Sequence, residues 1–203
     1  PLNEWAFNNR GVLFSEINQI KKAINDFNQA IKIRWKKAFA YNNRGAVYYE
    51  LNQFEIAIED FNEAIRLNPE FAQAYNNRGA CNYELNLLNK ADEDFNRAIK
   101  LMPDDFDVYN NRGELFNKLG NYEKANENFD KSLQLKPDYA KAYFNIGISY
   151  SQLEQQAKAI ENFRIAVKLN PKFTEQYKNY GQIYFEIIQY KNANDNFIQV
   201  ISP

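Results

Sequence analysis

Residues 38–71 read AFAYNNRGAVYYELNQFEIAIEDFNEAIRLNPEF, and the same pattern returns along the whole chain at an interval of 34 residues. Six of the seven glycines keep this interval: Gly11, Gly45, Gly79, Gly113, Gly147 and Gly181. Four of the six prolines keep it as well: Pro69, Pro103, Pro137 and Pro171. A fixed period of this length is typical of stacked supersecondary units, so we predict that residues 1–203 form one solenoid.

Each unit is numbered here from seven residues before its glycine, so that the glycine stands at repeat position 8. The repeats then cover 4–37, 38–71, 72–105, 106–139, 140–173 and a shortened 174–203. Position 4 is always aromatic, position 20 always alanine and position 24 always phenylalanine. Apolar residues at 4, 8 and 11, and again at 20, 24 and 27, have helical spacing, so each unit is predicted to be two closely packed helices, the second ending before proline.

This pattern of aromatic, glycine and aromatic, then Ala-x3-Phe-x2-Ala and proline, resembles the tetratricopeptide repeat over residues 4–203. The resemblance implies an all-α fold, a right-handed α-solenoid of six antiparallel helix pairs. It also implies that the first helices line a concave groove that holds partner segments. The chain departs from the family pattern at Trp35, where the other complete copies have proline, and at position 7, where the family usually has leucine.

Arginine occupies position 7 in the first four copies, on the packing side of the first helix, where a charge needs a partner. Position 23 of the second helix is aspartate in the first three copies and asparagine in the fifth and sixth, where the arginine is absent. Acid and base therefore occur together, except in the fourth copy, which has Arg112 with Asn128. We expect structural ion pairs within repeats: Arg10 with Asp26, Arg44 with Asp60, and Arg78 with Asp94.

Asparagine fills position 6 in all six copies, on the side of the first helix opposite its apolar stripe. Position 5 adds asparagine in the first four. Asparagine is a mediocre helix former, and its amide offers a donor and an acceptor that suit the backbone of an extended peptide. Similar asparagine ladders line the groove in other members of the resembled family, including O-GlcNAc transferases. The expected peptide contacts are Asn8, Asn9, Asn42, Asn43, Asn76, Asn77, Asn110, Asn111, Asn145 and Asn179, flanked by Trp5, Phe39 and Lys141.

The ladder sets the scale of the ligand. Helices packed ~8–10 Å apart and extended chain at ~3.3 Å per residue give about three peptide residues for each repeat. The basic residues that grip the carboxy-terminal tails of chaperones in some members of the family are not present as a set, because position 6 is never basic.

Composition argues against several other functions. The chain has no histidine and one cysteine, so we expect no catalytic centre, no metal site, no cofactor and no internal disulfide. A net charge of -1 without a basic stripe argues against nucleic-acid binding. No apolar run approaches the ~20 residues of a membrane span. The absence of Asn-x-Ser/Thr sites mildly favours a cytoplasmic location.

Two alternatives to a peptide-binding module remain open from the sequence. The last predicted helix, residues 190–201, has no helix after it to cover its apolar side, which would suit an assembly scaffold that self-associates there. The array could equally serve as the substrate-recognition arm of a larger enzyme.

Overall fold

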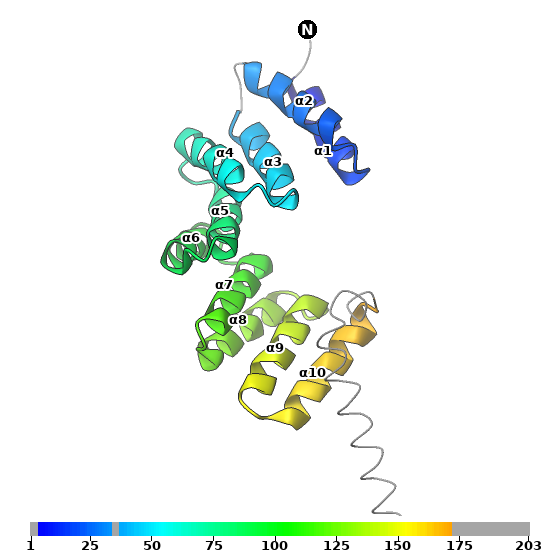
Figure 1. Ribbon diagram of the computed structural model, residues 1–203, viewed down its shortest axis with the longest axis vertical. Helices are drawn as coiled ribbons and strands as arrows, with labels where there is room; N and C mark the ends of the chain where they lie inside the picture. The colour runs from blue at the N-terminus through cyan, green and yellow to red at the C-terminus, as the bar shows by residue number, and fades with distance from the viewer. Residues whose placement is uncertain (1–3, 34–36, 172–203) are drawn as a thin grey trace, which may run out of the picture. The chain divides into compact units, whose positions relative to one another are not determined.

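The computed structural model describes residues 4–33 and 37–171, and Figure 1 shows these residues as a succession of helices. In that part of the chain there are ten α-helices and no strand: α1 (Glu4–Glu16), α2 (Ile20–Lys32), α3 (Lys37–Glu50), α4 (Phe54–Leu67), α5 (Ala72–Glu84), α6 (Leu88–Leu101), α7 (Phe106–Lys118), α8 (Tyr122–Leu135), α9 (Ala140–Gln152) and α10 (Gln156–Leu169). Each of the first five repeats thus supplies two helices. The predicted class, an all-α solenoid of helix pairs, is confirmed.

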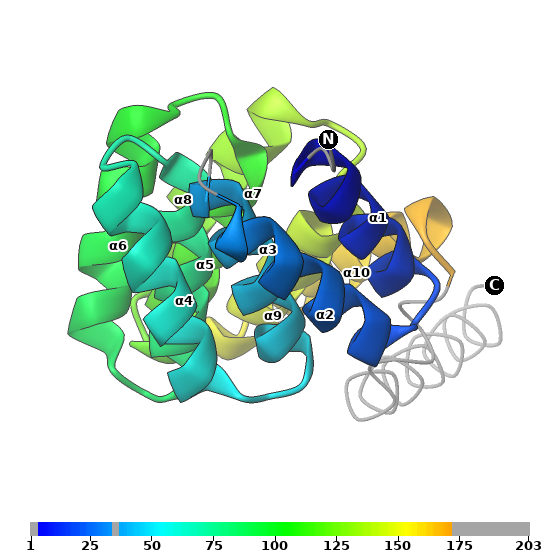
Figure 2. The same ribbon diagram turned by 90° about the horizontal axis from the view of Figure 1, so that it is seen from above.

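The chain divides into two compact units, Pro1–Asn111 and Arg112–Pro203, with the boundary inside α7. In the first unit α1 packs on α2, which lies beside it in Figure 2, and α3 packs on α4 and α5 on α6; in the second unit α9 packs on α10. That residues 1–203 act as one solenoid stays a prediction. The sixth repeat, 174–203, with Asn179 and the helix considered for self-association, lies outside the described residues.

Several first helices are followed by a residue with left-handed backbone at repeat position 15, two residues beyond the end of the helix. Asn18, Asn52 and Asn86 have φ of 58–59° there, and Gly120 has φ of 73°. Glycine and asparagine are the residues that tolerate this conformation best, and it closes a helix by letting the next amides bond back to the last turn. In the second repeat Gln53 N donates to Tyr48 O at 2.9 Å. Part of the chain's asparagine content therefore belongs to the turns between helices.

Within each pair, the phenylalanine at position 24 lies against the glycine at position 8. Phe27, Phe61, Phe95 and Phe129 are almost completely buried. A methyl group built on Gly45 would come within 2.8 Å of Phe61 Cε1, and one on Gly79 within 2.7 Å of Phe95 Cε1. Since carbon atoms in contact lie ~3.5–4.0 Å apart, only glycine fits at this crossing.

Neighbouring pairs join through position 10 of the first helix. Val47 packs with Ala23 and Phe27 of the preceding repeat, and Cys81 packs with Ala57 and Phe61. The predicted assignment of Cys81 as a small packing residue fits its complete burial. The first helices α3 and α5 therefore contact their own partner helices and also the pair before them.

Candidate functional site: an amide ladder along the first helices

The position-6 asparagines of the first unit lie on the first helices α1, α3, α5 and α7. Asn9 is exposed, while Asn43, Asn77 and Asn111 are half-buried. Helix α1 lies against α3, and α3 against α5. The polar face expected from the sequence therefore runs across successive repeats.

Position 5 differs from the expectation. Asn42 and Asn76 are only 7% exposed and Asn110 is fully buried, so these three amides are not open to a peptide. For Asn42 and Asn76 the cause is the first helix of the next repeat. Each of these two amides accepts a hydrogen bond from that helix, so position 5 lies in the contact between repeats and not on an open face. The expectation that position 5 belongs to the open face was wrong for these three residues.

The position-5 amides accept hydrogen bonds from position-6 amides of the next repeat. Asn43 Nδ2 donates to Asn8 Oδ1, Asn77 Nδ2 to Asn42 Oδ1, and Asn111 Nδ2 to Asn76 Oδ1, each at 3.0 Å. Position 6 of one repeat thus donates to position 5 of the repeat before it. Pairing satisfies a buried amide oxygen that would otherwise be costly, and it holds the amide at position 6 in one orientation.

Hydrogen bonds between adjacent asparagines of the same helix link these bonds into a chain. Asn42 Nδ2 donates to Asn43 Oδ1 and Asn8 Nδ2 to Asn9 Oδ1, each at 3.4 Å. The hydrogen bonds therefore run in one direction, from Asn77 through Asn42, Asn43 and Asn8 to Asn9. A side-chain amide has two N–H donors, and no described residue accepts the second one of Asn43 or Asn77. We call this set, Asn8, Asn9, Asn42, Asn43, Asn76, Asn77 and Asn111, the amide ladder.

The second unit has a different arrangement at the same positions. Phe144 replaces the asparagine at position 5 and is buried, with its ring 5.2 Å from that of Phe163. Asn145 is also buried; its Nδ2 donates to Glu114 Oε1 at 2.8 Å, and Lys141 Nζ lies 2.8 Å from the same oxygen. Lys141 and Asn145, both expected as peptide contacts, thus meet at one carboxylate. At 7% exposure Asn145 is as closed to a peptide as Asn42, so the expectation that it lies on an open face was wrong as well. An acid here was not foreseen as their partner, because Glu114 stands in the preceding repeat.

In the first unit the ladder is flanked by an aromatic side chain, Phe39 on α3, and by glutamates at position 13 of the first helices. Phe39 is 41% exposed, and its ring centroid lies 4.9 Å from that of Phe71. The side chain of Trp5 lies outside the described part of the structure. Position 13, two turns beyond the ladder, carries the exposed carboxylates of Glu16, Glu50 and Glu84.

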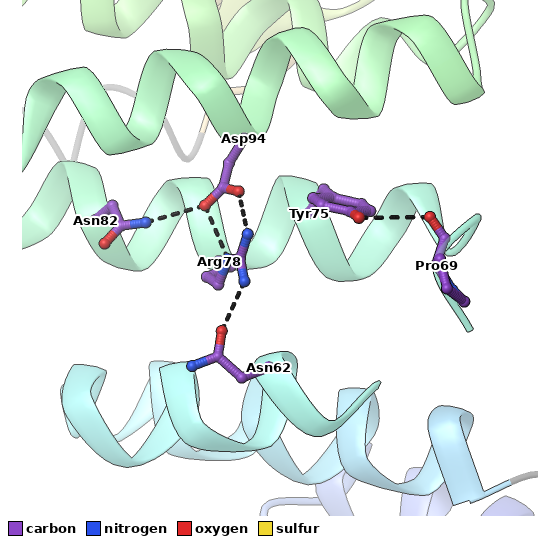
Figure 3. Close-up of polar contacts among 6 residues, drawn as sticks. All are labelled: Asn62, Pro69, Tyr75, Arg78, Asn82 and Asp94. Carbon is purple, nitrogen blue, oxygen red and sulfur yellow. Dashed lines mark hydrogen bonds and ion pairs between the residues drawn. The ribbon is translucent and has the colours of Figure 1, made fainter. Parts of the chain in front are cut away.

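The structure brings each expected arginine and aspartate together. In Figure 3, Arg78 Nη2 bonds Asp94 Oδ1 at 2.6 Å and Nε bonds Oδ2 at 3.0 Å. Arg10 meets Asp26, and Arg44 meets Asp60, with the same two-bond geometry. The hydrogen bonds to Asp60 raise the pKa of Arg44 above its ordinary value, so the guanidinium keeps its charge.

Two of the arginines also reach a neighbouring repeat, which was not predicted from the sequence. Arg78 Nη1 donates to Asn62 Oδ1 at 2.6 Å, and Arg44 Nη1 bonds Asn28 in the same way. Asn28 and Asn62 both stand at position 25. The joint presence of asparagine there and arginine at position 7 of the next copy could have predicted these contacts from the sequence. Asn82 adds a bond to Asp94 Oδ2 at 3.0 Å.

Arg10 and Arg112 depart from this arrangement. The side chain of Arg10 is 56% exposed, against 20% for Arg44 and 24% for Arg78. In the fourth repeat Asn128 Nδ2 donates to Lys124 O at 2.7 Å, and the Arg112 guanidinium lies over the Phe116 ring. The first copy therefore has the most exposed of the three ion pairs, and the fourth has an amide where they have a carboxylate.

Residues 4–33 and 37–171 hold no cluster of three acidic, cysteine or histidine side chains that could bind a metal. None of their helices is long and apolar enough to cross a membrane. Burial raises the pKa of the Cys81 thiol to about 12, so this cysteine is a protonated packing group at neutral pH. The amide ladder and the arginine pairs are thus the main polar networks of the described chain.

Stacked helix pairs with a line of polar side chains on the first helices define a helical-repeat protein. Models of the tetratricopeptide repeat match residues 11–52, 38–71, 72–105 and 104–172. The chain belongs to the tetratricopeptide repeat family, and it is a protein-interaction module of that family. No curated protein sequence matches it.

Three solved structures of similar fold, each under 25% identical, show the fold alone. The crystal structure of MamA is 24% identical with a TM-score of 0.66, over 81% of this chain and 96% of that one. YrrB, described as a TPR protein with an unusual peptide-binding site, is 24% identical with a TM-score of 0.61, over 83% and 87%. TTC0263, a thermophilic TPR protein of Thermus thermophilus, is 17% identical with a TM-score of 0.75, over 89% and 98%.

Proposed function

We propose that this chain binds an extended segment of a partner protein along the amide ladder and that it catalyses no reaction. The observation that carries the proposal is the state of Asn43 and Asn77. Each is held by an amide of the preceding repeat and retains an N–H that no described residue accepts. Fixed, half-buried donors of this kind are suited to backbone carbonyl groups, whatever the side chains of the ligand.

The position-5 amides have a supporting role in this proposal. They do not touch the ligand, but they fix the direction of the position-6 amides and so lower the ordering cost of binding. Phe39 adds an apolar contact one helical turn from Asn43 on α3. The first unit therefore offers a polar line with one aromatic side chain beside it.

The expected affinity is moderate. Each hydrogen bond contributes a net ~0.5–1.5 kcal/mol, and ordering a flexible peptide removes much of the sum. A single partner segment should then bind with a Kd on the order of micromolar. Tighter binding of a longer protein would require contacts beyond the ladder.

A peptide-library pull-down tests the proposal. It compares the parent chain with a variant carrying Asn43→Ala, Asn77→Ala and Asn111→Ala. The control variant, Asn25→Ala with Asn89→Ala, removes exposed asparagines of α2 and α6. We expect the parent and the control to retain the same peptides and the ladder variant to lose them, with a melting transition confirming that each variant is folded. Equal retention by the ladder variant would contradict the proposal.

A further inference from the structure

The repeat of the ladder places a condition on the conformation of its ligand. Its rungs are Asn9, Asn43, Asn77 and Asn111, one in each repeat, on successive first helices of the first unit. Neighbouring packed helices are ~8–10 Å apart, which corresponds to about three residues of extended chain. A ligand that meets every rung in the same way must therefore present the same backbone group at every third residue.

Extended conformations differ in whether they present the same backbone group in the same direction at every third residue. In a β-strand successive residues point to opposite sides, so residues three apart face opposite ways. Polyproline II has three residues per turn and a rise of ~3.1 Å, so one turn advances ~9.3 Å and returns the same carbonyl direction. Its period therefore matches one rung per turn, while that of a strand does not.

The uniform direction of the ladder bonds supports the same conclusion. In both Asn43 and Asn77 one N–H is directed to the preceding repeat, so the remaining donor has the same setting at these two rungs. A row of identically set donors suits a row of identically directed carbonyl oxygens. Polyproline II leaves its carbonyl groups free of internal hydrogen bonds, and a carbonyl-directed contact needs no ligand N–H, so proline residues are compatible with binding.

We infer that the ladder selects a partner segment in the polyproline II conformation, with one turn of ligand per repeat and proline tolerated in it. This inference rests on the proposed function and adds the conformation of the ligand. The exposed carboxylates of Glu16, Glu50 and Glu84 on the same first helices would favour a segment that also carries basic residues.

Two matched peptides of twelve residues test the inference: four copies of Pro-Pro-Arg, which favours polyproline II, and four copies of Thr-Val-Arg, which favours extended β conformation. Both carry the same charge, so attraction to the acidic edge cancels in the comparison. We expect Pro-Pro-Arg to bind the parent at least about tenfold more tightly, because its backbone is already ordered. The Asn43→Ala/Asn77→Ala variant should lose this preference, and the side-chain amide signals of Asn43 and Asn77 in the parent should shift in NMR spectra.

The outcomes separate the two proposals. If Thr-Val-Arg binds as tightly or more tightly, and the ladder variant weakens both peptides, the ladder contacts peptides but does not select polyproline II. If neither peptide shifts the Asn43 and Asn77 amide signals, both proposals fail. A preference for Pro-Pro-Arg that persists in the ladder variant overturns the inference, because the selection then arises elsewhere.

Discussion

Arg44 and Asp60 form two parallel hydrogen bonds between the two helices of one repeat, Nη2 to Oδ1 at 2.6 Å and Nε to Oδ2 at 2.8 Å. Both side chains are largely buried, and Arg44 also donates to Asn28 of the repeat before it. Two-bond pairs of arginine and carboxylate combine strength with defined geometry. Arg44 therefore connects three helices, α2, α3 and α4.

Asp60→Ala should lower the free energy of unfolding by about 3–5 kcal/mol, because it leaves a buried guanidinium without its counter-charge. Urea denaturation measures the change. Asp26→Ala is the matched control and should cost clearly less, since Arg10 is mostly exposed and water can solvate it. Equal losses of unfolding free energy in the two variants would show that burial of the arginine does not set how much its ion pair contributes to stability.

Gly45→Ala should lower the free energy of unfolding by about 1–3 kcal/mol, because its methyl group would lie 2.8 Å from Phe61 Cε1 in a packed interior. Phe61→Leu alone is also destabilising, but it leaves room beside the glycine. In the double variant the two losses should therefore be less than additive, which a double-mutant cycle detects. Strict additivity would contradict direct contact between these residues.

Asn42→Ala should cost about 1–3 kcal/mol of stability, because it removes a buried amide and leaves Asn77 Nδ2 without its acceptor. Asn43→Ala should cost less, since its position is more open to water, which can bond the Asn8 oxygen in its place. Thermal unfolding of both variants checks the order. A larger loss for Asn43→Ala would mean that position 6, and not position 5, has the structural role.

Cys81 should remain unreactive toward thiol reagents in the native chain at pH 8 and react at once in denaturant. Its pKa is raised to about 12 by burial, against 9.0 for a free thiol, so the folded thiol keeps its proton. The unfolded thiol ionises first, and the stability that this group contributes is lost as the pH rises from about 9 towards 12. Cys81→Ala should lack this part of the alkaline loss, which pH-dependent denaturation measures.

Much of the fold could be predicted from the sequence because its determinants are local and periodic. The helical spacing of apolar residues and the glycine that faces position 24 are repeated in every complete copy. The joint presence of arginine at position 7 and aspartate at position 23 predicted contacts that the structure contains. Repetition turned a single weak pattern into several independent observations of the same pair.

The ladder was only partly predictable. A helical wheel separates the apolar stripe from the opposite face, and it placed Asn42 and Asn76 on the open side. In the structure that side packs on the neighbouring first helix, so both are buried. The hydrogen bond from Arg78 to Asn62 was not predicted for the same reason, because it joins different repeats.

The sequence by itself determined the helices, their pairing within a repeat and the family, since all three follow from residue types at fixed spacing within 34 residues. Only the tertiary structure decided which asparagines stay accessible and which become the buried supports of their neighbours. The physical reason is that burial of a polar side chain depends on the helix of the adjacent repeat. The position of that helix is set by packing between repeats and not by the pattern inside one.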